Sequence, residues 1–255
     1  MATTDLELVM FNASHYNEKA RWALDWKRLP HRRTSLLPGP HSRVVTKLTG
    51  QTQVPVLRVA GRAIAGSAAI IDELERLSPE PPLYPADPGE RRRALEIQEH
   101  FDEQVGPHIR RALFSILIHE PTWTAALFAS DRSAPARFAY RCVLPLVRPV
   151  MVKSMQIVEP QVSESFAATQ RGFDFVAERV GPKGYLVGDR FTVADLAAAA
   201  LLTPGVDVAH PDMRKPDPKP PRIQEWLARW ADHPGAAWVR EIYARHRPPR
   251  ASMPG

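Results

Sequence analysis

A short polar turn near the N-terminus contains the residues best suited to hold an anion. The strand-like run LELVMF at 6–11 ends at Asn12, and Ser14 directly precedes the helical pattern HYNEKARWALDW at 15–26. The N-terminus of a helix carries unpaired backbone N–H groups and a partial positive charge, so it stabilises anions. Serine also commonly caps helices through its hydroxyl. The turn is therefore either a simple helix cap or a place where Ser14 donates to a bound anion.

Two further stretches have the chemistry of a binding edge. Pro55, in QVPVL at 53–57, has no N–H for a strand ladder, so it belongs at a strand start or a turn. Ser67, in GSAAI at 66–70, precedes a helical pattern, where a hydroxyl and free N–H groups can bind a carboxylate. The structural alternatives are an ordinary trans proline at a strand edge and a plain helix cap.

Alternating strands and helices are expected to position these residues. The pattern predicts strands at 6–11 and 30–37, two short strands over 54–65 joined at Ala60-Gly61, and helices at 15–27 and 67–77. This order predicts a small α/β unit with a mixed sheet.

A proline-rich connector follows, with five prolines in the 13 residues of SPEPPLYPADPGE. We therefore predict a first domain at 1–79, a linker at 80–88 and a second domain at 89–255. The second domain is predicted to be all-α, and FTVADL at 191–196 has capping-box spacing between Thr192 and Asp195. Its expected helices lie at about 89–118, 121–129, 134–156 with a break near Pro145, 159–180, 192–202, 222–231 and 235–246.

Composition excludes several kinds of site. Cys142 is the only cysteine in 255 residues, so an intrachain disulfide, a Cys-rich zinc site and a CxxC pair are all impossible, and we expect no metal. The net charge of +6 is not gathered in a basic stripe with aromatics, so we expect no nucleic-acid partner. The chain has neither a secretory signal nor about 18 uninterrupted apolar residues. We expect a cytoplasmic protein with no membrane partner.

The order of these features resembles the cytosolic glutathione transferase family. SHYNEKARWALDW, QVPVL and GSAAI are similar to the thioredoxin-like domain of that family, and GDRFTVADL at 188–196 is similar to its helical domain. The resemblance extends over nearly the whole chain and is nearest to bacterial members with a serine site and no assigned subclass. It implies glutathione as co-substrate, a homodimer and a role in detoxification.

The resemblance also implies roles for particular residues. Ser14 lies where relatives place a catalytic Ser or Cys; since neither 14 nor 17 is Cys, activation of a bound thiol is expected rather than disulfide exchange. Tyr16 and Asn12 are alternative donors to that thiol. His15 is expected to be a surface or helix-start residue rather than a base.

Glutathione itself is expected to bind through the second and third stretches. Val54-Pro55 is expected to be cis and to border the deepest cleft, with the Val54 backbone pairing with the cysteinyl part of glutathione. Ser67 would hold the γ-glutamyl carboxylate, and Gln53 or Lys47 the glycyl carboxylate. Gly66 departs from the family, which usually has Glu, Asp or Gln there to meet the ammonium group. Another low-molecular-weight thiol, weakened glutathione binding, or an acidic group supplied from elsewhere would each fit that departure.

The electrophilic second substrate is expected to bind in an apolar pocket between the Ser14 turn and the first long helices of the second domain. Candidates that line it are Tyr16, Arg110, Phe114, Trp123 and Tyr140. Arg110 or Arg111 in the cleft would favour an acidic co-substrate, whereas Arg21 and Asp72 are expected to form a structural ion pair. The expected activity is transfer of a bound thiolate to an electrophilic small molecule. The alternative is a non-catalytic binding or interaction protein that has kept the fold.

Overall fold

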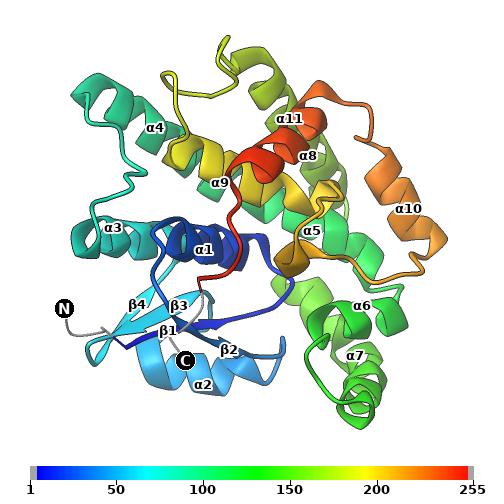
Figure 1. Cartoon of the computed structure of the whole chain (residues 1–255). Coiled ribbons are helices and arrows are strands. Elements are labelled where there is room, and N and C mark those ends of the chain that lie inside the picture. The colour runs from blue at the N-terminus through cyan, green and yellow to red at the C-terminus, as the bar shows by residue number, and fades with distance from the viewer. Residues whose placement is uncertain (1–4, 252–255) are drawn as a thin grey trace.

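A four-stranded mixed sheet forms the base of the first domain in the computed structural model, which describes residues 5–251. Its strands are β1 (Leu6–Met10), β2 (Arg32–Ser35), β3 (Val56–Val59) and β4 (Arg62–Ala65), in the order β2-β1-β3-β4. β1 runs parallel to β2 and antiparallel to β3, and β3 and β4 form a hairpin. Helices α1 (His15–Trp26) and α3 (Ser67–Leu77) cover one face, and α2 (His41–Thr49) covers the other (Figure 1). The predicted α/β class is confirmed.

The apolar pattern explains this layering. Every residue of β1 is buried, as expected for a central strand covered on both faces. The β3–β4 turn is tight, with φ of 47° at Ala60 and 77° at Gly61, the left-handed conformation that two-residue hairpin turns require. The predicted hairpin at these two residues is therefore confirmed.

Strand register brings the three predicted stretches to one end of the sheet. Val9, near the end of β1, pairs with Val56 at the start of β3, and Val56 pairs with Ala65 at the end of β4. All three stretches therefore lie at the same end of the sheet: the Ser14 turn, the Val54-Pro55 peptide and the start of α3. The backbone N–H of Gly66 also donates to the carbonyl oxygen of Pro55 at 3.0 Å.

The second domain is all-α, as predicted, and α9 lies at its centre with every residue buried. The predicted capping box is present, because Thr192 accepts from the first turn of α9 while Asp195 accepts from the backbone of Thr192. Its helices are α4 (Pro88–His100), α5 (Gly106–Leu117), α6 (Pro121–Phe128), α7 (Ala134–Ser154), α8 (Gln161–Arg179), α9 (Val193–Leu202), α10 (Pro221–Ala228) and α11 (Pro234–His246), with a π-helical turn η1 (Phe101–Val105) and the short 3-10 turns η2 (Thr203–Gly205) and η3 (Pro211–Met213).

Two helical assignments differ from the sequence prediction. α2 was not predicted at all; it is a short helix, and only Val45 of its nine residues is fully buried. The break expected near Pro145 is wrong, since α7 continues through both Pro145 and Pro149. Both prolines are exposed, so the carbonyl groups that lose their helical partners can bond to water instead.

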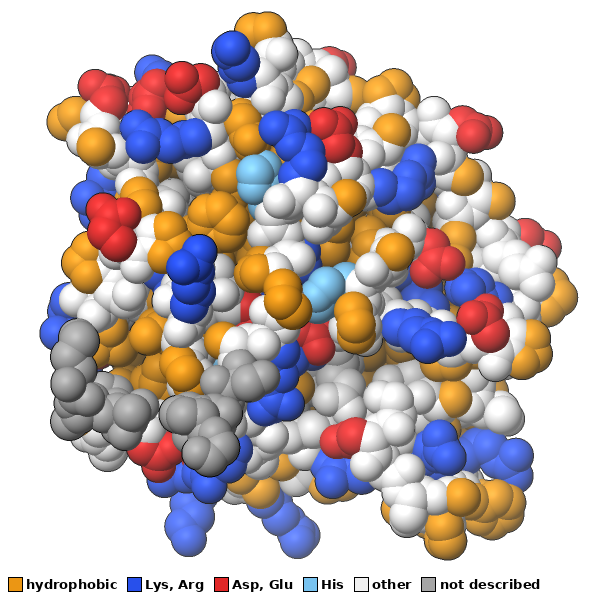
Figure 2. Space-filling view, in the orientation of Figure 1, with side chains coloured by type: hydrophobic (Ala, Val, Ile, Leu, Met, Phe, Trp, Pro, Cys, Tyr) orange, Lys and Arg blue, Asp and Glu red, His pale blue; other side chains and the backbone are white. Residues whose placement is uncertain are grey.

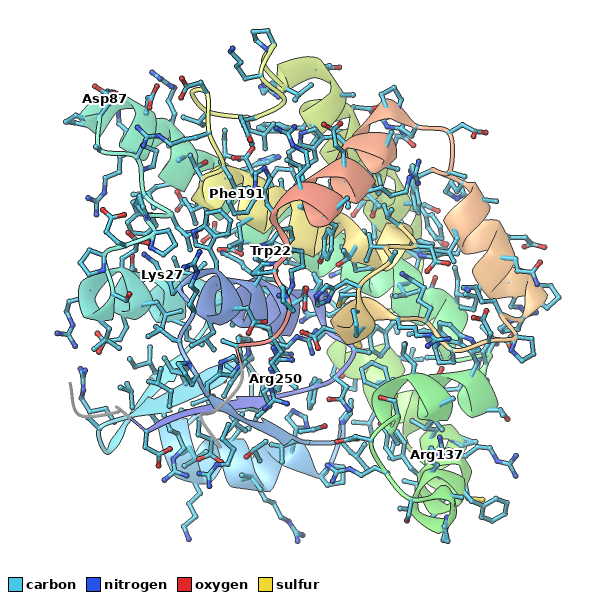
Figure 3. All side chains as sticks on the ribbon, in the orientation of Figure 1. Trp22, Lys27, Asp87, Arg137, Phe191 and Arg250 are labelled. Carbon is cyan, nitrogen blue, oxygen red and sulfur yellow. The ribbon has the colours of Figure 1, made fainter. Side chains whose placement is uncertain are left out.

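Helix α1 joins the two domains. The Trp22 ring stacks on Phe191 of the second domain at 5.6 Å between ring centres (Figure 3). Tyr16 and Lys19 both bond to Asp102 in η1. These contacts fix the N-terminus of α1 against the second domain, which is where the site lies.

Two surface properties bear on partners. No helix among residues 5–251 is long and apolar enough to cross a membrane. The face seen in Figure 2 shows Lys and Arg side chains scattered among apolar and acidic ones, without a continuous basic stripe.

Candidate functional site

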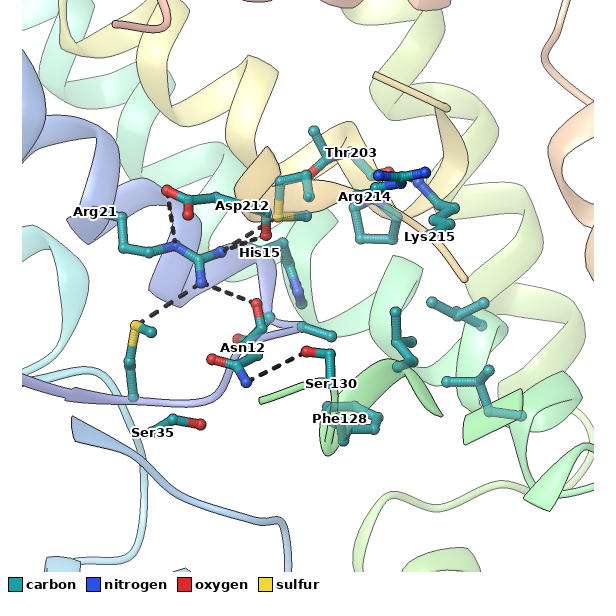
Figure 4. A pocket seen from close by; sticks show the side chains of 18 of the residues that line it. Asn12, His15, Arg21, Ser35, Phe128, Ser130, Thr203, Asp212, Arg214 and Lys215 are labelled. Atoms are coloured by element: carbon teal, nitrogen blue, oxygen red, sulfur yellow. Dashed lines mark hydrogen bonds and ion pairs between the residues drawn. The ribbon is translucent and has the colours of Figure 1, made fainter. Parts of the chain in front are cut away.

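A cavity of about 450 Å³ lies between the Ser14 turn and the second domain. The Ser14 turn, residues 12–15, forms part of its wall on the side of the first domain, and α5, α6, α10 and the segment 203–215 form most of the remainder (Figure 4). Its volume falls within the usual range for small-molecule sites.

Ser14 lies at the N-cap of α1 but does not use its side chain as a cap. Its backbone is extended, with φ −153° and ψ 127°, and its hydroxyl makes no capping hydrogen bond in the described chain. Only its carbonyl oxygen enters the helix, accepting from the backbone N–H of Glu18 at 2.8 Å. The Ser14 hydroxyl is therefore available to a ligand in the cavity, next to the positive end of α1.

His15 lines the same cavity and is buried, so the expectation of a surface position is wrong although α1 does begin there. Its Nε2 lies 2.9 Å from the carbonyl oxygen of Gly106. Burial, and then the nearby Arg110 charge, lower the His15 pKa to about 3. The imidazole is therefore neutral at physiological pH and is a poor base. Its Nε2 donates to Gly106, which orients the start of α1.

The other two candidate donors differ from Ser14 in what they contact. The Tyr16 hydroxyl donates to the Asp102 carbonyl at 2.5 Å, and Tyr16 is not among the residues that line the cavity. Burial, together with the Asp102 carboxylate, raises the Tyr16 pKa well above its usual value. Asn12 does line the cavity, and its amide lies 3.5 Å from the Ser130 hydroxyl. Asn12 thus remains a possible donor, whereas Tyr16 holds α1 against η1.

Arg21 belongs to a buried ionic cluster and not to a pair with Asp72. Its Nε donates to Glu18 at 2.9 Å and lies 3.9 Å from Asp212, while Asp72 accepts from the Tyr84 hydroxyl. The predicted Arg21–Asp72 ion pair is therefore wrong. The cluster is Glu18, Arg21, Asp25, Arg33, Asp212 and Arg247.

This cluster is electrically balanced and joins distant segments. Arg247, after α11, bonds to Glu18 and Asp25 of α1 at 2.7 and 2.9 Å and to Asp212 of η3 at 2.7 Å. Burial opposes ionisation of Asp212, but Arg21, Arg33 and Arg247 lower its pKa to about 2. The cluster thus anchors the C-terminal segment and η3 beside the cavity.

Three of the predicted second-substrate residues line the cavity, namely Arg110, Phe114 and Trp123. Tyr140 and Arg111 do not line it: Tyr140 is buried and donates to the Pro38 carbonyl, and Arg111 bonds to Met155 and Ser165. Arg110 is therefore the arginine of this pair that reaches the cavity.

The predicted glutathione-binding stretch lies outside the cavity. Val54-Pro55 is cis, as predicted, and neither residue lines the cavity. Gln53, Gly66 and Ser67 are absent from the lining as well. Gln53 is exposed, and Ser67 is buried at the first position of α3. The sheet edge and the cavity are thus two adjoining regions that meet at the Ser14 turn.

Sequence reasoning missed the contribution of residues 203–215. Asp212, Arg214 and Lys215 line the cavity from a proline-rich loop that shows no helical or strand periodicity. Only the density of charged residues in HPDMRKPDPK marked this loop as unusual. As for metals, residues 5–251 contain no group of three or more His, Cys, Asp or Glu side chains placed to hold an ion.

Comparison with known proteins identifies the family. Residues 8–82 match the family described as glutathione S-transferase, N-terminal domain, and residues 159–229 match glutathione S-transferase, C-terminal domain. The two matches together span more than half of the chain, which therefore belongs to the glutathione S-transferase family. No protein of curated function matches the sequence.

Solved structures share the fold at low identity. FzlA from C. crescentus is 20% identical, with a TM-score of 0.62 over 94% of this chain and 88% of that one. A glutathione S-transferase from Methylobacterium radiotolerans, in complex with glutathione sulfonate, is 23% identical, with a TM-score of 0.61 over 99% of both chains. One from Methylobacillus flagellatus, with glutathione bound, is 16% identical, with a TM-score of 0.61 over 94% of this chain and 95% of that one. At these identities the likeness shows the fold alone.

Proposed function

We propose that the protein binds glutathione and activates its thiol as a thiolate, which then attacks an electrophilic small molecule in the adjoining cavity. The observation that carries the proposal is that Ser14 lines the cavity at the N-terminus of α1 and that its hydroxyl makes no capping bond in the described chain. A hydroxyl donor and a helix N-terminus both favour a thiolate over a thiol. Family membership, and two relatives of the same fold with glutathione or its sulfonate bound, support the choice of thiol.

The reaction is a nucleophilic displacement. The thiol loses its proton to solvent, the sulfur forms a bond to the electrophilic carbon, and the leaving group departs with the electron pair of the bond that breaks. The Ser14 hydroxyl lowers the energy of the sulfur anion, and the cavity holds the electrophile close to it. The cis peptide edge, with the Val54 backbone, Gln53 and Ser67, holds the remainder of glutathione. Detoxification in the cytoplasm would be the corresponding biological role.

A second function is favoured by one observation, the glycine at position 66. Gly66 offers no side chain to the ammonium group of glutathione, and no atom lies within 4 Å of the space that a Cβ would fill. A protein that kept the fold but lost thiol recognition would be a binding or interaction protein.

Retention on glutathione resin separates the two functions. The proposed enzyme is retained, is eluted by free glutathione, and shows ultraviolet thiolate absorbance in the complex. A chain that flows through the resin, with no thiolate signal at millimolar glutathione, would support the non-catalytic alternative and contradict the enzyme.

A further inference from the structure

Positive charge remains around the cavity after the buried ion pairs are counted. Arg21, Arg33 and Arg247 are matched by the three carboxylates of the buried cluster. The other charged residues of the lining are Arg110, Arg214, Lys215 and Arg250, opposed only by Asp131. The cavity therefore has an excess of cations on its walls, which attracts anionic ligands.

Lys215 is the most constrained of these cations. Its side chain is buried, and its Nζ donates to the carbonyl oxygens of Val206 at 2.6 Å and Thr203 at 3.3 Å. The nearest carboxylate, Asp207, is exposed, lies 4.0 Å away and is shared with Lys219. Carbonyl oxygens orient an ammonium group but do not neutralise it. Burial lowers the Lys215 pKa to about 8, so the group is still mostly charged at neutral pH.

Two arginines accompany this lysine. Arg214 precedes it in the chain and lies beside it in the cavity, near Thr203 (Figure 4). Arg110 reaches the cavity from α5. Within residues 5–251, the guanidinium groups of both arginines form neither a hydrogen bond nor an ion pair, although Arg214 lies near enough to the Asp217 carboxylate for their charges to interact. Each guanidinium can therefore donate to a carboxylate, which it matches in geometry.

Much of the remaining lining of the cavity is apolar. It is formed by α5, α6 and α10 through Leu113, Phe114, Leu117, Trp123, Phe128 and Ile223. The Trp123 indole N–H is occupied by the Pro216 carbonyl at 3.0 Å, so the ring offers the cavity an apolar surface. The same bond ties this part of the lining to the loop that carries Arg214 and Lys215.

From this division we infer that the electrophile is an amphipathic acid: an aromatic or aliphatic body against α5 and α6, and a carboxylate held by Arg214, Lys215 and Arg110. This inference rests on the proposed function and names the substrate class of the same site. The carboxylate is not consumed in the reaction. It anchors the molecule so that the reactive carbon faces the sulfur near Ser14.

Binding of a matched pair of probes tests the inference without requiring a thiol. 2-Naphthoate and its neutral amide, 2-naphthamide, have the same ring system and differ in charge. Quenching of tryptophan fluorescence, with Trp123 in the wall, reports binding. We expect the acid to bind at least tenfold more tightly than the amide, as charge-assisted hydrogen bonds imply.

Variants locate the source of that preference. Arg214→Gln, at an exposed position, and Lys215→Met should each reduce the preference for the acid by about tenfold and leave amide binding unchanged. Arg137→Gln, on the exposed side of α7 and away from the cavity (Figure 3), is the matched control and should change neither. Equal binding of the two probes, or a preference that Arg214→Gln leaves intact, would overturn the inference. Because no thiol is present, failure of glutathione to bind contradicts the proposed function and does not affect this result.

Discussion

The family resemblance placed Ser14 first as donor, with Tyr16 and Asn12 as alternatives, and the surroundings of Tyr16 now separate it from the other two. The Tyr16 hydroxyl is committed to the Asp102 carbonyl, whereas the Ser14 hydroxyl lies in the cavity wall with no capping role in the part of the chain described. A hydroxyl that stabilises neither helix nor core, at a helix N-terminus, is available for ligand chemistry. This is the difference on which the proposed function depends.

Gly66 provides a test of backbone conformation at the scale of one residue. Its φ of 93° lies in the region that favours glycine, and a Cβ there would have no atom within 4 Å. Gly66→Ala should therefore lower the free energy of unfolding by roughly 1–3 kcal/mol through backbone strain alone. Chemical denaturation with unchanged slope would report it. A variant as stable as the parent chain would contradict a positive φ at position 66.

At the scale of elements, α1 is the helix that serves both domains. It presents Tyr16 and Lys19 to η1, Trp22 to Phe191, and Glu18 to Arg247. Position 14 thus gains a fixed orientation from contacts made along the whole helix.

Arg247 is the residue whose loss should disturb this element most. Arg247→Ala would leave Glu18 and Asp25, both fully buried, without their C-terminal partner. Removing one member of a buried pair costs about 3–5 kcal/mol, so the melting temperature should fall strongly. Arg245→Ala, two residues earlier, is the control: its half-exposed guanidinium pairs with exposed Glu241 and donates to the Tyr185 hydroxyl, so its loss should cost only about 1–2 kcal/mol. Similar small losses for both variants would contradict the structural role of the cluster.

Local patterns predicted the elements, and long-range contacts account for what they missed. Periodicity predicted α1, α9 and the β3–β4 hairpin, because each depends on residues close in sequence. The exposed prolines of α7 gave a false helix break, because sequence alone does not tell which side of a helix faces water. For the site, the sequence predicted Ser14, Arg110, Phe114 and Trp123 in one cavity region, but Asp212 and Lys215 reach it from a loop without regular structure.

At the scale of the molecule, the fold brings the edge with the cis Val54-Pro55 peptide and the cavity together at the Ser14 turn. This arrangement agrees with membership of the glutathione S-transferase family. The cis Val54-Pro55 peptide belongs to the sheet edge and does not line the cavity. Glutathione lying along the edge would direct its sulfur toward Ser14 and the cavity beyond it.

The homodimer implied by the family resemblance remains a prediction about the assembled molecule. Light scattering at micromolar concentration should give a mass twice the 28.6 kDa of the chain. A mass equal to that of a single chain would contradict it.

The central claim is that Ser14 stabilises a bound thiolate, and titration of that thiolate tests it most directly. In the glutathione complex of the parent chain, thiolate absorbance should titrate below the value of about 8.5 for a free thiol. Ser14→Ala should raise that pKa, by about 1.4 kcal/mol for each unit, and lower turnover at neutral pH with recovery at higher pH. Its melting temperature should change little, because the hydroxyl makes no capping bond within residues 5–251.

Tyr16→Phe is the matched control for this measurement. It should lower the melting temperature by removing the bond to Asp102 and leave the thiolate titration where it was. The account thus predicts a shifted titration in Ser14→Ala alone. An unshifted titration in Ser14→Ala, with the shift instead in Tyr16→Phe or in neither variant, would contradict it.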